Sequence, residues 1–180
     1  MKATPLAIAD VLALEPRVFE DGRGVFFESY NASAFEAATG RAAIFVQDNH
    51  SRSKRNVMRG LHYQIGKPQG KLVRVVSGEI FDVAVDLRRS SSTFGRWVGE
   101  YLSAENNRQI WIPPGFAHGF FAVADAVCLY KTTEYFFPEH ERCISWDDPT
   151  LKIEWPLSGA PILSERDSQR RLFVNAEVFP

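Results

Sequence analysis

Two neighbouring runs of strand-forming residues limit what this chain can fold into. KLVRVV (71–76) and EIFDVAVDL (79–87) flank the dipeptide Ser77-Gly78, a two-residue connection that is typical of a tight β-hairpin. In the second run the apolar residues alternate with Asp82 and Asp86, so one face of the strand is apolar and the other carries both carboxylates. This stretch predicts a strand-based core rather than a helical one.

More strands are expected towards the C-terminus. RQIWIPPG (108–115) predicts a strand that two prolines and a glycine stop, and residues 118–137 predict two strands with a turn between them. Many short strands separated by turns favour a β-sandwich or a jelly-roll barrel. The predicted fold class is therefore mainly β, a sandwich or jelly-roll barrel with a few short peripheral helices.

Helix signals are few and lie outside the strand-rich part. Asn31 can cap a helix over residues 32–39, because its side-chain oxygen can accept from the free N–H groups of the first turn. Ser164 followed by Asp167 resembles a cap for a short helix over residues 165–173. Two short helices at the periphery are the expectation.

Length and charge bound the number of domains and the kinds of partner. With 180 residues, 45% hydrophobic and 24% charged, the chain suits a single domain over residues 1–180. A formal net charge of -1 gives no general attraction to nucleic acid or to anionic membranes. Neither partner is expected, and any anionic ligand must be held by a local group of basic side chains.

The sequence signals for export, membrane insertion and disulfide bonds are weak. Residues 1–16 lack a basic segment followed by a long apolar core, and no apolar run reaches the roughly 18 residues of a membrane helix. Cys128 and Cys143 are the only cysteines and form no CxxC motif. We expect reduced thiols and a cytoplasmic protein.

Histidines in two strand-like segments raise the question of a metal site. The PxGxxH sequence that ends at His118 resembles the second motif of cupin barrels, and RGLHYQ (59–64) stands where their HxH motif is expected. Gln64 occupies the place of the second histidine. His62 and His118 alone are too few ligands for a transition metal, so no metal is expected. The residues by themselves leave His62 open as a general base or as a buried core residue.

An ordered set of segments resembles one enzyme family. The segments are FFESYN (26–31), QDNHSRS (47–53), RGLHYQ (59–64), QGKLVRVVSGEIFDVAVDLR (69–88), STFGRW (92–97), WIPPGFAHGF (111–120), YKTTEYF (130–136), WDDPTLKIEWP (146–156) and LSERD (163–167). In these segments the chain is similar to the dTDP-4-dehydrorhamnose 3,5-epimerases, which have the cupin fold. The resemblance runs from about Leu14 to Asp167.

That resemblance implies an isomerase that needs no metal or organic cofactor. Its substrate would be dTDP-4-dehydro-6-deoxy-D-glucose, and its product dTDP-4-dehydro-L-rhamnose, after inversion of C3 and C5 on either side of the C4 ketone. Such chemistry needs a base on one face of the sugar, an acid on the other and a positive group near the enolate oxygen.

The family's catalytic positions are matched by four residues. By resemblance, His62 is the general base, Asp167 orients its ring, and Tyr130 donates a proton from the opposite face. Lys71 matches a lysine beside the sugar ketone, in both a catalytic and a binding role. A lysine or tyrosine in a strand is more often a solvated or packed residue, so these roles rest on the resemblance.

Further positions match residues that bind the substrate in the family. They are Arg23, Glu28, Gln47, Asn49, Arg59, Lys71, His118, Glu141 and Arg166. In the family the strand that carries the first two crosses to a partner subunit, which implies a homodimer with an exchanged N-terminal strand. Arg166 stands where many members have lysine, and the nucleobase has two candidate stacking partners, Tyr135 and Phe136.

Other functions stay open at this point. A relative that inverts only C3 or only C5 of another deoxysugar nucleotide would share the same base. A sugar-nucleotide-binding cupin without catalysis is disfavoured by the four matched catalytic positions. A metal-dependent dioxygenase is disfavoured by Gln64.

Overall fold

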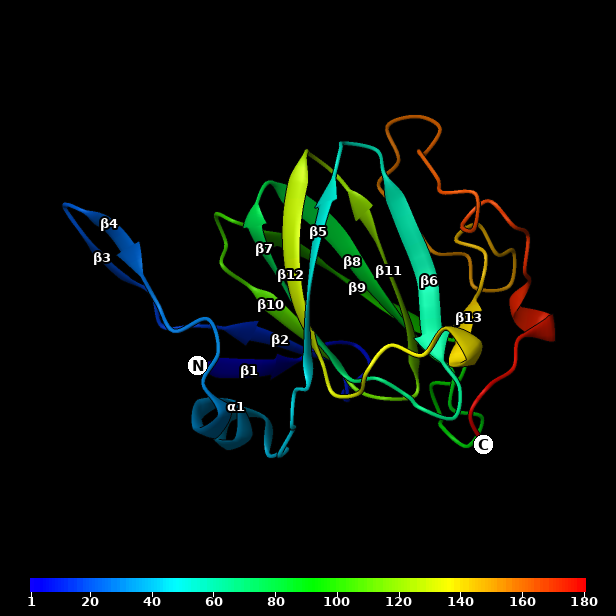
Figure 1. Cartoon of the computed structure of the whole chain (residues 1–180), viewed down its shortest axis with the longest axis horizontal. Coiled ribbons are helices and arrows are strands. Elements are labelled where there is room, and N and C mark those ends of the chain that lie inside the picture. The colour runs from blue at the N-terminus through cyan, green and yellow to red at the C-terminus, as the bar shows by residue number, and fades with distance from the viewer.

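The computed structural model describes residues 1–180, which form two facing β-sheets and one projecting ribbon (Figure 1). The first sheet contains, in spatial order, β1 (Lys2–Pro5), β2 (Leu12–Glu15), β10 (Gln109–Ile112), β7 (Lys71–Ser77), β12 (Ala126–Thr132) and β5 (Gln47–Ser53). The second contains β13 (Glu141–Cys143), β6 (Met58–Gln64), β11 (Phe116–Ala122), β8 (Glu79–Asp86) and β9 (Trp97–Ser103). The predicted mainly β, cupin-like architecture is confirmed, although the two sheets stay separate and do not close into a barrel.

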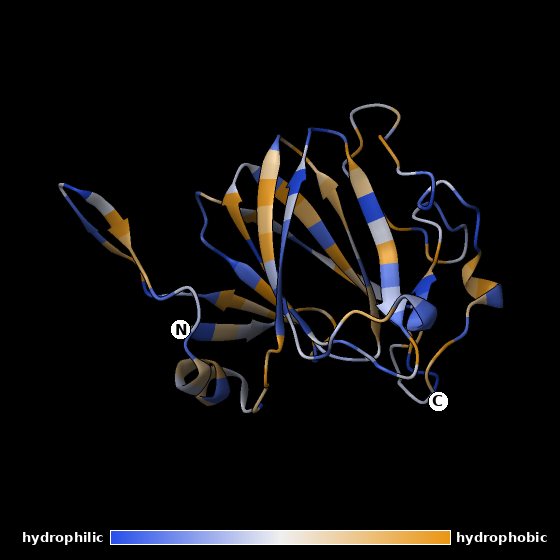
Figure 2. Ribbon diagram, in the orientation of Figure 1, coloured by the Kyte–Doolittle hydropathy of each residue, from blue (hydrophilic) through white to orange (hydrophobic).

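The core lies between the two sheets. Val73 and Ile110 from the six-stranded sheet pack with Ile80 and Phe120 from the five-stranded sheet in one buried cluster. A second cluster covers the outer face of the five-stranded sheet, where Val83 meets the chain that follows β13. Strand β8 is therefore buried on both faces, and its Asp82 face looks into the space between the sheets. Figure 2 shows apolar and polar residues alternating along several strands.

The dipeptide Ser77-Gly78 is not the tight hairpin that the sequence suggests. Strand β7 belongs to the six-stranded sheet and β8 to the five-stranded one, so the connection crosses between the sheets. Gly78 has a φ of 75°, and a Cβ there would lie 1.9 Å from the backbone oxygen of Asp125. Where the chain passes from one sheet to the other, Gly78 allows the positive φ and the close approach of the two backbones. A hairpin turn also favours glycine, so both connections have the same sequence pattern.

Helix α1 (Ala32–Thr39) is as predicted. The side chain of Asn31 accepts from the backbone N–H of Ala34, and Gly40 ends the helix in the left-handed conformation. Buried Phe35 packs on Leu14 and Trp111, so the helix covers one end of the outer face of the six-stranded sheet.

The second predicted helix, over residues 165–173, is wrong. One turn forms, with Ser168 N–H bonded to the carbonyl of Ser164 at 3.0 Å. Arg171 then exchanges backbone and side-chain hydrogen bonds with Ser145, which takes the chain away from a helical path. Only two short 3-10 helices, η1 (Pro138–His140) and η2 (Phe173–Asn175), accompany α1. Residues 133–137, expected in a strand, form a loop after β12.

The N-terminal ribbon stands away from the two sheets. Strands β3 (Phe19–Asp21) and β4 (Gly24–Phe26) pair only with each other, and Figure 1 shows them projecting from the body of the molecule. The side chains of Phe19, Val25 and Phe26 are exposed at 50%, 59% and 70%. No helix of the structure combines the length and the apolar character that a membrane crossing needs.

Candidate active site

A close approach of two strands places two histidines side by side. Strands β6 and β11 are antiparallel, and His62 is the direct cross-strand partner of His118. Beside this pair, a Cβ on Gly60 would lie 2.6 Å from the Cα of Gly119, and Gly60 has a φ of 106°. Glycine at both positions allows the backbones to touch, which fixes the two imidazoles at one end of the space between the sheets.

His62 has a buried carboxylate as its partner. Its Nε2 lies 2.6 Å from Oδ1 of Asp167. Asp167 lies in the turn after Ser164 and is 105 residues away from His62 in the sequence. The other carboxylate oxygen accepts from Ser164 Oγ at 2.7 Å. Burial raises the pKa of Asp167, but the hydrogen bonds from His62 and Ser164 outweigh it, so the net pKa lies below the usual value. Asp167 is thus a carboxylate fixed against one ring nitrogen.

His118 forms a second histidine–aspartate pair in the same space. Its Nε2 lies 2.8 Å from Oδ2 of Asp82 on β8. Burial lowers the pKa of His118, and the negative charge of Asp82 offsets part of this effect. His118 therefore stays neutral at physiological pH. The other oxygen of Asp82 is buried without a partner, so it remains able to accept a hydrogen bond.

Lys71, at the start of β7, brings a cation to these pairs. Its side chain is buried, and burial lowers its pKa to about 8, with Asp82 and Glu141 opposing a larger fall. At neutral pH the ammonium is still mostly charged. A positive group in a place of low dielectric acts strongly on any negative charge that forms nearby.

The six-stranded sheet contributes the opposite wall. On β12, Tyr130 packs against the core between the sheets and pairs with Asn49 of β5. Burial raises the pKa of Tyr130, and Arg59 offsets part of that rise, so the phenol keeps its proton. Gln47 donates to the Asn49 side chain at 2.9 Å. The histidines and the tyrosine therefore belong to different sheets that face one another.

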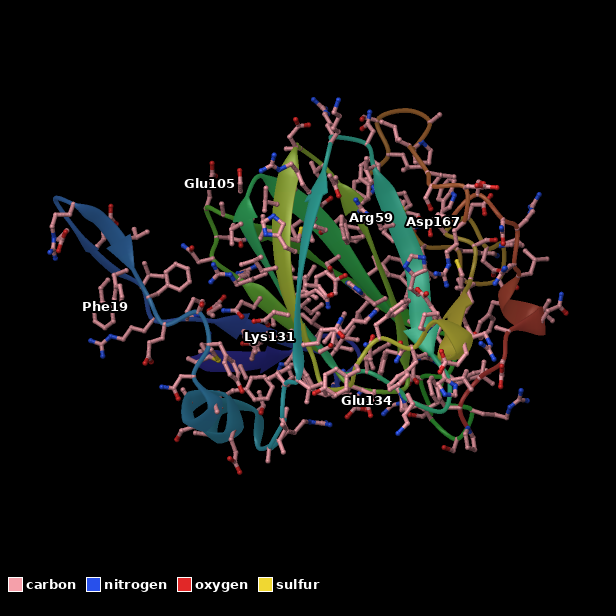
Figure 3. All side chains as sticks on the ribbon, viewed as in Figure 1. Phe19, Arg59, Glu105, Lys131, Glu134 and Asp167 are labelled. Atoms are coloured by element: carbon pink, nitrogen blue, oxygen red, sulfur yellow. The ribbon has the colours of Figure 1, made fainter.

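Charged residues surround this space. Arg59 of β6 donates to Ser53 Oγ at 3.0 Å, and Glu141 of β13 forms an ion pair with Arg166. Figure 3 labels Arg59 and Asp167 near β6. Arg166, which stands where many family members have lysine, thus has a definite partner, and its guanidinium neutralises the carboxylate of Glu141.

Gln64 has a structural use that explains why no histidine stands there. Its Nε2 donates to the carbonyls of Lys67 and Tyr135 at 2.8 and 3.1 Å, and its Oε1 accepts from Phe137 N–H at 2.8 Å. The amide ties β6 to two loops, and an imidazole cannot make this set of bonds. The loop thus fixed carries Tyr135 and Phe136, which are exposed at 54% and 48%.

Two predicted site residues lie elsewhere in this chain. Arg23 sits in the turn of the projecting ribbon, where it is paired with Asp21 at 2.6 Å. Glu28 accepts from Asn31 at 3.1 Å at the start of α1. Neither is brought to His62 within the same chain.

Two residues near the candidate base were missed at the sequence level. Asp82 was visible only as a carboxylate on the second face of β8, and its contact with His118 depends on the neighbouring strand. Ser164 was read as a helix cap, yet its hydroxyl holds the carboxylate of Asp167. The Ser164–Asp167 spacing of a helix cap was the only sequence signal for this contact, because a cap and a serine that holds the Asp167 carboxylate require the same spacing.

These side chains together suit proton transfer next to a carbonyl group. A histidine with a carboxylate partner can take a proton, a tyrosine on the facing sheet can give one, and an ammonium can stabilise an enolate oxygen. The two-sheet fold and this set of groups define a cupin-fold isomerase of the acid–base type.

Comparison with known proteins gives the particular family. The model of the dTDP-4-dehydrorhamnose 3,5-epimerase family matches residues 5–175, and the chain belongs to this family. An enzyme of that name from Pseudomonas aeruginosa is 66% identical over 181 residues, which is 100% of both chains. The crystal structure of dTDP-6-deoxy-D-glucose-3,5-epimerase from Legionella pneumophila, in complex with dTDP-4-keto-L-rhamnose, is 49% identical with a TM-score of 0.92. It covers 95% of this chain and 92% of its own.

A relative of different specificity has the same fold. ChmJ from Streptomyces bikiniensis, a 3'-monoepimerase in complex with dTDP-quinovose, is 33% identical with a TM-score of 0.89, covering 97% of this chain and 88% of its own. Fold alone therefore does not separate double from single epimerisation.

Proposed function

We propose that this protein converts dTDP-4-dehydro-6-deoxy-D-glucose to dTDP-4-dehydro-L-rhamnose by inverting C3 and C5. The observation that carries the proposal is His62 on one sheet, paired with Asp167 at 2.6 Å, and Tyr130 on the facing sheet. The 66% identity to the Pseudomonas aeruginosa epimerase along the whole chain supports the choice of substrate.

In the proposed mechanism His62 takes the proton from the carbon next to the ketone. The electron pair moves to the C4 oxygen, and the charged Lys71 stabilises the resulting enolate. Asp167 holds the ring and stabilises the imidazolium that forms. Tyr130 then gives a proton to the opposite face of the same carbon. His62 releases the abstracted proton to solvent and Tyr130 regains one from solvent, so the configuration is inverted with no net change in protons.

Both sheets contribute substrate-binding residues around the same space. His118 lies beside the base and, with Arg59 of the same sheet, orients the sugar, while Gln47 and Asn49 line the facing sheet. Glu141 and Arg166 form the ion pair at the edge. Tyr135 or Phe136 stacks on the thymine, since both rings are about half exposed on the loop that Gln64 fixes.

We propose that no metal or organic cofactor takes part. The Gln64 amide is fully engaged by backbone groups, which supports a structural rather than a metal-binding origin for this position. We also propose a cytoplasmic location, because both cysteines are free and buried.

The active unit is proposed to be a homodimer in which the ribbon enters the partner's site. An isolated two-stranded ribbon is not stable alone in water, and the apolar side chains of this one are exposed by half or more. Packing on a second copy would bury them. The same movement would bring the guanidinium of Arg23 to the diphosphate, a ligand that suits its planar set of donors.

Subunit complementation tests the dimer. Arg23→Ala and His62→Ala chains are each expected to be inactive, and mixing them under conditions of subunit exchange should restore activity in hybrid sites with both residues intact. No recovery despite demonstrated exchange would place the ribbon in the site of its own chain.

Product analysis tests the reaction itself. Incubation with dTDP-4-dehydro-6-deoxy-D-glucose should yield the sugar inverted at both carbons, as read from proton coupling constants in NMR spectra. His62→Asn should form it about 10²–10⁴-fold more slowly. The alternative is a monoepimerase such as ChmJ, which is 33% identical to this chain, and at C3 it predicts a product inverted at that carbon alone.

A further inference from the structure

A third metal-ligating side chain lies against the catalytic pair. Cys143 of edge strand β13 is the direct cross-strand partner of His62. The ligand atoms of His62, Cys143 and Asp167 all lie within 4.8 Å of one another. Cys143 has no part in the proposed reaction.

We propose that these three side chains form an inhibitory zinc site. Zinc is held by cysteine sulfur at about 2.3 Å and by histidine nitrogen and carboxylate oxygen at about 2.0–2.2 Å, which separates neighbouring ligand atoms by about 3.3–3.8 Å. The ligand atoms lie within 4.8 Å of one another, and Nε2 of His62 is 2.6 Å from Oδ1 of Asp167. Around a zinc ion this last pair would move apart by about 0.7 Å, and a wider spacing would close by up to about 1.5 Å. A water molecule completes the tetrahedron.

Charge and burial favour a divalent ion with this ligand set. Cys143 and Asp167 are each 5% exposed, so the metal would be largely removed from water. On binding, Cys143 loses its proton to solvent and a Zn–S bond forms. Zn²⁺ with one thiolate and one carboxylate is then a neutral group, which limits the cost of burial. Thiolate and imidazole also select zinc over magnesium and calcium.

Access comes from the side of the imidazole. The side chain of His62 is 28% exposed, so an ion can reach the cluster through the space where the substrate is proposed to bind. Once zinc holds a nitrogen of His62 and an oxygen of Asp167, the pair can no longer take a proton from the sugar. This inhibition rests on the proposed function, whereas the binding of zinc does not.

Zinc binding is measured first without any enzyme assay. Chelator-treated wild type, Cys143→Ser and the control Cys128→Ser are dialysed against zinc chloride, and bound metal is measured. Cys128 is the other free buried cysteine, and it lies on β12, outside the cluster. We expect one zinc per chain in wild type and in Cys128→Ser. Cys143→Ser should bind about 100-fold more weakly, since even the loss of an outer-shell partner costs about 10–100-fold.

Cobalt reports the sulfur ligand without a variant. Co²⁺ added to wild type should give a sulfur-to-metal charge-transfer band that an equal concentration of zinc removes. Absence of that band, or equal zinc binding in wild type and Cys143→Ser, would overturn the site. Zinc that binds as expected while turnover is unchanged would instead refute His62 as the base.

Discussion

Replacement of Asp167 by asparagine isolates the contribution of the carboxylate to the base. The carboxylate is 5% exposed and meets Nε2 of His62 at 2.6 Å, so it is well placed to stabilise an imidazolium. A hydrogen bond to a charged group contributes about 1.5–3 kcal/mol, and each 1.36 kcal/mol is tenfold in rate. Asp167→Asn should therefore lower turnover by about 10- to 150-fold.

His62→Asn should cost more, because the general base itself is lost, an effect typically of about 10²–10⁴-fold. Two groups that act as one unit are not additive. The double variant should therefore be little slower than His62→Asn alone. Ser164→Ala is the matched control: it removes the 2.7 Å hydrogen bond to the other carboxylate oxygen but leaves the carboxylate and its contact with His62, so it should cost less than Asp167→Asn.

The assay is turnover at saturating substrate for the three variants and the double variant, with dTDP affinity measured separately. Losses that multiply in the double variant would show that Asp167 does not act through His62, and would falsify the pairing.

Four further outcomes are expected. Burial lowers the pKa of Lys71 to about 8, so the ammonium is lost and turnover should fall as pH rises through that value. Lys71→Met should be slow and should not show this alkaline fall in turnover; the same fall in the variant would assign the titrating group elsewhere. Tyr130→Phe should still let solvent deuterium enter the sugar while net inversion drops, and normal inversion would move the acid role to another group. Gly60→Ala should lower the midpoint of thermal unfolding, because its Cβ would lie 2.6 Å from the facing backbone. Gly159→Ala, where a Cβ would have nothing within 4 Å, should not lower it. Equal midpoints would contradict the close approach of β6 and β11. Chelator-treated protein should keep full activity, and activity restored only by iron or zinc would contradict a metal-free reaction.

Local sequence signals predicted those elements whose cause is local. The helix over 32–39 depends on a cap at Asn31 and a glycine at its end, and both are present as expected. The alternation in residues 79–87 gave the two faces of β8, because strand periodicity follows from backbone geometry alone.

Errors arose where distant contacts decide the conformation. The connection at Gly78 crosses between the sheets at a point where the backbone of Asp125 lies against it, and no local pattern reveals this. The helix expected over 165–173 stops after one turn, since Arg171 bonds to Ser145 instead. A polar segment with few apolar side chains to bury has little to hold it helical against such bonds.

In the candidate site, too, residue identities could be predicted, whereas contacts between distant segments could not. The identities of His62, Tyr130 and Lys71 were available from the resemblance, but their surroundings were not. Asp82 enters the site only because β8 lies beside β11, and Cys143 reaches His62 only because β13 pairs with β6. Such contacts depend on the order of strands in the sheets.

Exchange with heavy water tests the proposed reaction most directly. Wild-type protein and His62→Asn are incubated with dTDP-4-dehydro-6-deoxy-D-glucose in deuterium oxide, and the sugar is analysed by mass spectrometry and NMR. Abstraction at both carbons by one base predicts deuterium at C3 and at C5 with wild type, and far slower entry at both carbons with His62→Asn. Deuterium at a single carbon, or undiminished exchange in the variant, would contradict double epimerisation by His62.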